Sequence, residues 1–177
     1  MVIVTEERLQ GVRFFEFLTE EEREEFAEGS DLVTFEVGEE IIEEGAGTHD
    51  LFVLTSGRVE VRKRIPGGGD RLLAELDAAG EPTVVGERGL LVESGASATV
   101  RAASRIEAIK IPHETFRRMI SEGRPAAFRL SYRIARTLAH RLTRLDEEVV
   151  VAIRELERRG ETDLDAFRDK LITDWAV

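Results

Sequence analysis

The sequence has no cysteine and only one tryptophan, one tyrosine and four prolines among its 177 residues. Without cysteine there is no disulfide, no thiol nucleophile and no thiolate metal ligand, so we expect a cytoplasmic protein. No apolar run approaches the roughly 20 residues that a membrane-spanning helix needs. The opening residues, Met1 to Glu7, include neither a basic stretch nor a small-residue cleavage site. We therefore expect no membrane partner and no secretory signal.

Positive charge is scarce in the first part of the chain. Residues 1–50 carry 16 acidic side chains against three arginines, within a whole-chain net charge of −11. An acidic face repels phosphates, so we expect no nucleic acid partner here, and a solvated helix face is the plainest interpretation. The 18 residues after Arg159 are too few and too acidic for a winged helix-turn-helix, so no DNA-binding domain is expected.

Reactive side chains form no recognisable catalytic or metal-binding pattern. His49, His113 and His140 lie far apart without the spacing of metal ligands. The glycines at 67–69 lack the Gly-Lys-Ser/Thr ending of a phosphate loop and are typical of a hairpin tip. We expect no enzyme activity, no catalytic residues and no metal site.

The sequence does contain a series of short β segments between helical ends. Residues 1–30 have apolar positions that suit short helices, and Thr19 with Glu22 forms a capping box. Residues 31–111 hold short β-branched runs between glycine-rich turns, which predicts a compact roll or barrel. The expected strands are 32–35, 40–42, 51–54, 58–61 and 71–74.

Helical spacing resumes over residues 112–159, and one long helix is expected from Pro125 to about Arg159. A heptad seam runs along it through Phe128, Ser131, Ala135, Leu138, Leu142, Leu145, Val149, Ala152 and Leu156. A second copy is the simplest partner for so long a seam, so we expect a homodimer whose interface runs from Ala135 to Leu156. The alternative is a helix packed on its own domain, above all between Phe128 and Leu138.

The last expected segment is a short terminal helix over residues 160–177. Leu164, Phe167, Leu171 and Trp175 share one face of it. Trp175 is either an anchor that docks this helix or part of a surface for a partner.

The most specific stretch is Gly86-Glu87-Arg88, followed at a short distance by Ala96-Ser97-Ala98. Gly86 permits a tight entry, and Glu87 begins a short helix whose free N–H groups form an anion site. This stretch resembles the phosphate-binding cassette of cyclic nucleotide-binding domains, which occur in the catabolite activator family, kinase regulatory subunits and gated channels. The resemblance covers roughly residues 14–144 and includes Phe35-x-x-Gly38-Glu39, Glu44-Gly45, Asp50 with Gly57, and Gly80.

The resemblance implies an α+β fold, a double-stranded, jelly-roll-like β-roll with flanking N-terminal helices and a long C-terminal dimerisation helix. In the family the cassette ends in Arg-Ser/Thr-Ala, whose arginine pairs with the cyclic phosphate, while the glutamate matched by Glu87 binds the ribose. Here Ala96 supplies no donor. Arg88 or Arg101 could compensate, although helix neighbours point about 100° apart and Arg101 could face either way. Arg141-Leu142 stands where the catabolite activator helix offers hydroxyls to the purine.

We interpret the chain as a stand-alone, cytoplasmic, bacterial signalling module that acts through a protein partner. The candidate ligand-binding residues are Gly86, Glu87, Arg88, Ala96, Ser97 and Ala98. Ala96 argues against ordinary binding of cyclic AMP or cyclic GMP, so no cofactor is expected, a cyclic nucleotide being the one candidate. Two alternatives stay open: a genuine cyclic nucleotide sensor with an atypical pocket, and a structural scaffold.

Overall fold

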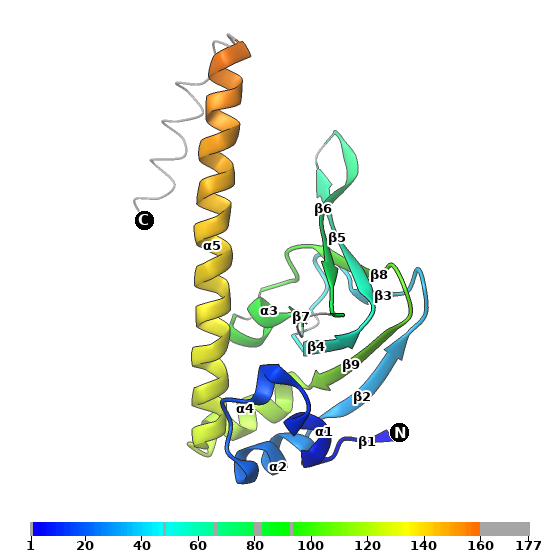
Figure 1. The fold of residues 1–177 in the computed structure, drawn as a ribbon, viewed down its shortest axis with the longest axis vertical. Helices are drawn as coiled ribbons and strands as arrows, with labels where there is room; N and C mark the ends of the chain where they lie inside the picture. The colour runs from blue at the N-terminus through cyan, green and yellow to red at the C-terminus, as the bar shows by residue number, and fades with distance from the viewer. Residues whose placement is uncertain (1, 48, 66, 80–82, 93, 160–177) are drawn as a thin grey trace. The chain divides into compact units, whose positions relative to one another are not determined.

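The strands form two antiparallel sheets, as Figure 1 shows for the computed structural model. The structure describes residues 2–47, 49–65, 67–79, 83–92 and 94–159. The first sheet has the order β1 (Val2–Ile3), β2 (Asp31–Phe35), β9 (Ile106–Ile111), β4 (Leu51–Ser56) and β7 (Thr83–Val85). The second has the order β3 (Glu40–Ile42), β8 (Thr99–Ala102), β5 (Arg58–Ile65) and β6 (Gly69–Asp77). The predicted β-roll is confirmed.

The core of the roll is built by strand residues from both sheets. Successive side chains on a strand point to opposite faces, so every second residue reaches the interior. On β8, Val100 and Ala102 are buried in this way, and on β5 Val59 is fully buried. Phe35 of β2 and Phe52 of β4, the strands on either side of β9, pack edge to face with ring centroids 6.0 Å apart. A polar residue two positions from a buried one on the same strand therefore lies on the inward face.

The N-terminal segment folds as α1 (Glu6–Gln10), a 3₁₀ turn over Arg13–Phe15 and α2 (Glu20–Glu28). The predicted capping box is present, because the Glu22 N–H donates to Thr19 Oγ1 and the Thr19 N–H donates to Glu22 Oε2. Phe15 and Phe26 are fully buried. Helices this short are only marginally stable in isolation, so packing of the buried aromatic side chains stabilises them.

Two helices follow the roll, α4 (His113–Ser121) and α5 (Pro125–Arg159). Asp50 Oδ1 accepts a hydrogen bond of 2.9 Å from the His113 N–H, which satisfies one of the free donors at the start of α4. The first turns of α5 bury Ala126, Ala127, Leu130 and Ile134. The Arg133 guanidinium lies 5.9 Å from the centre of the Phe14 ring, so this part of α5 contacts the N-terminal segment.

The chain divides into two units, residues 1–134 and 135–177, and the boundary falls inside α5. The expected long helix is present as α5, and it continues unbroken past Asp146 to Arg159, which the sequence alone left open. Trp175 and the terminal helix expected over residues 160–177 lie outside the described residues. The finer division at residues 30, 111 and 159 stays a prediction.

Candidate functional site

The candidate cassette begins at a left-handed glycine. β7 ends at Val85, Gly86 has φ +84°, and α3 (Glu87–Leu91) starts at the next residue. A Cβ atom on Gly86 would lie 2.2 Å from the backbone oxygen of Asp50. Only glycine fits this position, because a side chain would meet both an unfavourable φ and the backbone of Asp50, the residue before β4.

Glu87 is the first residue of α3, and only 6% of its surface is exposed. A carboxylate is costly to bury unless polar groups surround it, and Glu87 does take part in further polar interactions. Its position at the start of a helix also favours negative charge. The helix start expected from the sequence is therefore present, and its first residue, Glu87, is buried.

The other half of the cassette is paired to the loop after β3. The Gly45 N–H donates to the Ala96 carbonyl over 2.9 Å, and the Ala96 N–H donates to the Ala46 carbonyl over 3.1 Å. Gly95 lies so close to this loop that a Cβ atom there would stand 2.8 Å from the Gly45 oxygen. The Ala96 side chain packs against the core of the roll. The cassette is thus fastened to the loop by backbone contacts on both sides of residue 96.

Of the two arginines considered as replacements, Arg101 points away from the core and pairs elsewhere. Arg88 is exposed on α3. Arg101 lies on β8 between Val100 and Ala102, whose side chains are buried in the core, so Arg101 faces away from it. Its guanidinium pairs with Glu40 Oε1 over 2.8 Å. Of the two orientations left open for Arg101, the structure has the outward one.

Sequence reasoning missed a cation that does reach the cassette, Lys63 of β5. Its Nζ donates to the Ser97 carbonyl over 2.5 Å and lies 2.8 Å from Glu44 Oε1. The signal in the sequence is the alternation Val59, Val61, Lys63, in which a charged residue takes an apolar position. The remaining cassette residues, Ser97 and Ala98, are exposed and half-buried respectively.

The structure brings two of the three histidines together. The His49 and His113 rings lie 5.2 Å apart, centre to centre, where the chain enters β4 and α4. In the part of the chain that the structure describes, no group of three or more His, Cys, Asp or Glu side chains could hold a metal ion. None of the described helices is long and apolar enough to cross a membrane.

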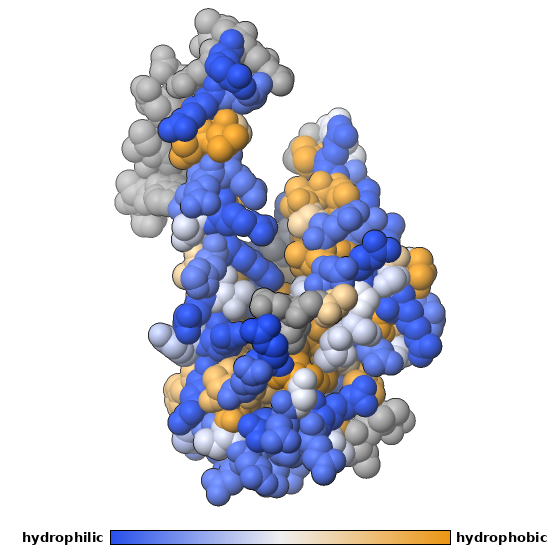
Figure 2. All heavy atoms as spheres, in the orientation of Figure 1, coloured by the Kyte–Doolittle hydropathy of each residue, from blue (hydrophilic) through white to orange (hydrophobic). Residues whose placement is uncertain are grey.

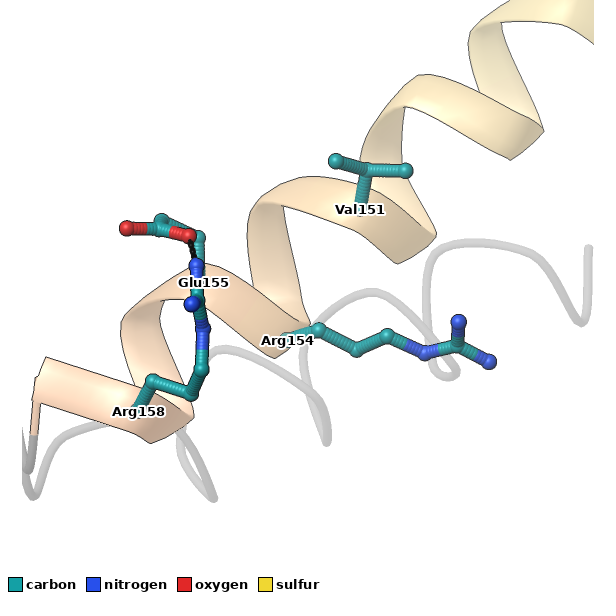
Figure 3. A pocket seen from close by; sticks show the side chains of 4 residues that line it. All are labelled: Val151, Arg154, Glu155 and Arg158. Atoms are coloured by element: carbon teal, nitrogen blue, oxygen red, sulfur yellow. Dashed lines mark hydrogen bonds and ion pairs between the residues drawn. The ribbon is translucent and has the colours of Figure 1, made fainter.

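A hollow of about 590 Å³ lies beside the last turns of α5. Its described lining residues are Val151, Arg154, Glu155 and Arg158. Figure 3 shows that Glu155 and Arg158 pair with each other while Arg154 extends away from them. Binding sites are built from polar groups that converge from several elements, and the described lining residues all come from one helix, so they do not by themselves define a site.

The fold and the turn together place the protein in a class of two-sheet rolls that have a short helix opened by glycine, with a buried acid as its first residue. A family model described as "Cyclic nucleotide-binding domain" matches residues 32–122, just over half of the chain. The chain belongs to the cyclic nucleotide-binding domain family.

Two curated relatives contain matching regions. The cGMP-dependent protein kinase of Toxoplasma gondii is 31% identical over 121 residues, which cover 68% of this chain and 11% of the kinase. The Pycsar effector protein RsmPycTIR of Rhodovulum sp. (strain MB263) is 38% identical over 102 residues, which cover 56% of this chain and 37% of the effector. The chain therefore spans only a minor part of the length of these relatives.

Solved structures agree with this assignment. A cyclic nucleotide-binding domain from Methylobacillus flagellatus has a TM-score of 0.70 at 16% identity, covering 81% of this chain and 79% of that one. The Thermus thermophilus catabolite activator protein has a TM-score of 0.64 at 25% identity, covering 83% and 71%. The first of these likenesses concerns the fold alone.

Proposed function

We propose that this protein is a non-enzymatic regulatory module of the cytoplasm that forms a homodimer through α5 and signals through contacts with a protein partner. The single observation that carries the proposal is an exposed apolar seam on a charged helix. Its interface would comprise Ala135, Leu138, Leu142, Leu145, Val149, Ala152 and Leu156.

The described seam residues are exposed or half-buried. Leu142 and Leu145 are 52% and 54% exposed, although leucine normally contributes its area to a core. Ala135 and Ala152 are exposed, and Leu138 and Val149 are half-buried. In the view of Figure 2 the visible face of α5 is largely hydrophilic, with one apolar patch toward its C-terminal end. Burying such a seam against a second copy would supply the knobs-into-holes packing of a coiled coil.

The alternative of a helix packed entirely on its own domain finds less support. The side chains of α5 that do enter the core are Ala126, Ala127, Leu130 and Ile134. These residues differ from the seam residues, and Phe128, the first residue of the seam, is 54% exposed. Among the described residues, the helix therefore has one face buried in its own domain and a second, largely exposed face that carries Leu142 and Leu145.

In this module the cassette would lack its usual contact to a cyclic phosphate. Alanine at position 96 removes the charge-assisted pairing on which the family's usual cyclic phosphate contact depends. Ordinary high-affinity binding of cyclic AMP or cyclic GMP is therefore not expected. The second candidate, a sensor with an atypical pocket, is favoured by one observation: buried Glu87 and left-handed Gly86 keep the geometry of the turn.

Light scattering on the purified chain at micromolar concentration tests the dimer. We expect a dimer that becomes monomeric when Leu142→Glu and Leu145→Glu are combined, because four charges would then face one another in the seam. Val151→Glu is the matched control, since Val151 is 64% exposed on another side of the same helix. A monomeric wild type, or a dimer unaffected by the double substitution, would overturn the proposal.

A further inference from the structure

Lys63 occupies a position on β5 where the strand pattern calls for an apolar side chain. Val59 is fully buried, and Val61 packs against the core two residues later. Because alternate residues of a strand share a face, Lys63 continues the inward face toward the end of the roll. Its side chain is 41% exposed, so it stands at the edge of the interior rather than inside it.

The Lys63 side chain contacts the cassette itself. Its Nζ donates to the Ser97 carbonyl over 2.5 Å, although the two residues are 34 positions apart in the sequence. Ser97 directly follows Ala96, the residue that stands where the family places its arginine. A positive charge therefore lies one residue from the position that lost one.

Glu44 holds Lys63 in this place. Glu44 Oε1 lies 2.8 Å from Lys63 Nζ, while Glu44 Oε2 accepts a hydrogen bond of 2.8 Å from the Arg64 N–H. The Glu44 N–H donates to Thr99 Oγ1 over 3.0 Å, which fixes the loop to β8. The hydrogen bond from Lys63 is the largest influence that lowers the pKa of Glu44, so this carboxylate is charged at neutral pH.

We propose that Lys63 supplies the cassette's positive charge in place of an arginine at position 96 and makes this site selective for a nucleoside cyclic monophosphate over the neutral nucleoside. The inference rests on the proposed regulatory module with an altered cassette. A lysine acts as a point charge, whereas arginine binds phosphate with two parallel donors. Lys63 would therefore give anion selectivity with a lower affinity than an arginine gives.

Titration calorimetry on the full chain tests this with two matched ligand pairs, cyclic AMP against adenosine and cyclic GMP against guanosine. A hydrogen bond to a charged group accounts for about a tenfold difference in affinity, so we expect the better cyclic nucleotide to bind about tenfold more tightly than its nucleoside. Lys63→Met should reduce that ratio to within about twofold, and Lys63→Arg should keep it.

Arg101→Met is the matched control. Arg101 is 42% exposed and pairs with Glu40 over the same 2.8 Å, but it lies on the outward face of the same sheet. The ratio should not change in this variant. The ratio should also fall as salt is raised from 50 to 500 mM, because the contact is partly exposed to screening ions. If Lys63→Met does not fold, as judged by circular dichroism, Lys63→Gln replaces it.

Three results would overturn the role of Lys63: equal affinity of nucleoside and cyclic nucleotide for the wild type, an unchanged ratio in Lys63→Met, or no binding of any of the four ligands at millimolar concentration. None of these results bears on the dimer, which light scattering decides separately. A monomeric wild type that still binds cyclic nucleotide through Lys63 would reject the proposed dimeric module and keep this inference.

Discussion

At the scale of single residues, Gly86 sets the geometry of the cassette. Replacing it by alanine forces a side chain into a left-handed φ and places Cβ 2.2 Å from the Asp50 backbone oxygen. Strained backbone conformations of this kind cost about 1–3 kcal/mol, and here the neighbouring backbone cannot simply rotate away. We expect Gly86→Ala to lower the free energy of unfolding by at least that amount in urea titrations followed by circular dichroism.

Gly38 provides the control for this substitution. It has φ +89°, and a Cβ atom there would meet nothing within 4 Å. Gly38→Ala should therefore show the conformational cost alone, about 1–2 kcal/mol. If the two alanine variants lose the same stability, the close approach of Gly86 to Asp50 has no energetic weight.

Glu44 predicts a pH dependence. Its pKa is lowered in the folded chain, chiefly by the hydrogen bond from Lys63, so the unfolded chain binds the proton more readily. The contribution to stability is therefore complete above the ordinary value of 4.5 and is lost as the pH falls below it. Urea titrations should find wild type more stable than Glu44→Gln at pH 7 and the difference shrinking below pH 4.5. A gap that widens on acidification would contradict this assignment.

The sequence identified Glu87 and Ala96 but not Lys63, and the reason is physical. Gly86 and Glu87 act through local backbone geometry, which the order of residues encodes directly. Lys63 becomes part of the cassette only because β5 pairs with β8, with Val61 opposite Val100 and Arg62 opposite Thr99. Its distance from Ser97 therefore depends on strand register. Register cannot be read from one strand alone.

At the scale of elements, the sequence predicted the features that depend on neighbouring residues, namely helix caps and helix starts. The capping box at Thr19 and the helix starts at Glu87 and Pro125 follow from residues within a few positions of each other. The short β7 and the six-residue β9 were not singled out as strands. β9 lies between β2 and β4 and pairs with both, so its place depends on contacts with segments distant in the sequence.

The long helix shows where periodicity alone is insufficient. Leu130 and Ile134 are buried, while Leu142 and Leu145 are exposed, yet all four are apolar residues at helical spacing. A heptad pattern does not distinguish an apolar helix face that packs on its own domain from one that packs on a second chain. Burial separates the two groups, and the change falls at the boundary between the two units.

At the scale of the whole molecule, Asp50 links the cassette to the helices that follow the roll. Its backbone oxygen borders Gly86, and its carboxylate accepts from the His113 N–H at the start of α4 while pairing with Lys110 over 3.1 Å. A shift of the cassette turn would therefore act on the first turn of α4. Conformational changes are transmitted through packed side chains and hydrogen bonds of this kind when the connected elements can adopt two conformations.

The distribution of burial predicts that the roll folds without the seam. Among the described residues, every side chain that is buried lies before Ala135. A chain truncated after Arg141 keeps all of them and loses most of the apolar seam. It should be monomeric, with the same free energy of unfolding, within about 0.5 kcal/mol, as the full chain carrying Leu142→Glu and Leu145→Glu, because removing exposed surface changes little.

Concentration provides the decisive measurement for this truncation. A dimer gains stability by mass action, so the melting temperature of the wild type should rise between 1 and 100 µM protein, whereas that of the truncated chain should stay constant. Circular dichroism melts at both concentrations make the comparison, with light scattering to establish the mass of each species. An unfolded truncated chain would show that folding needs residues among the 142–177 that were removed. A melting temperature that still rises with concentration would show that the dimer contact lies before residue 142.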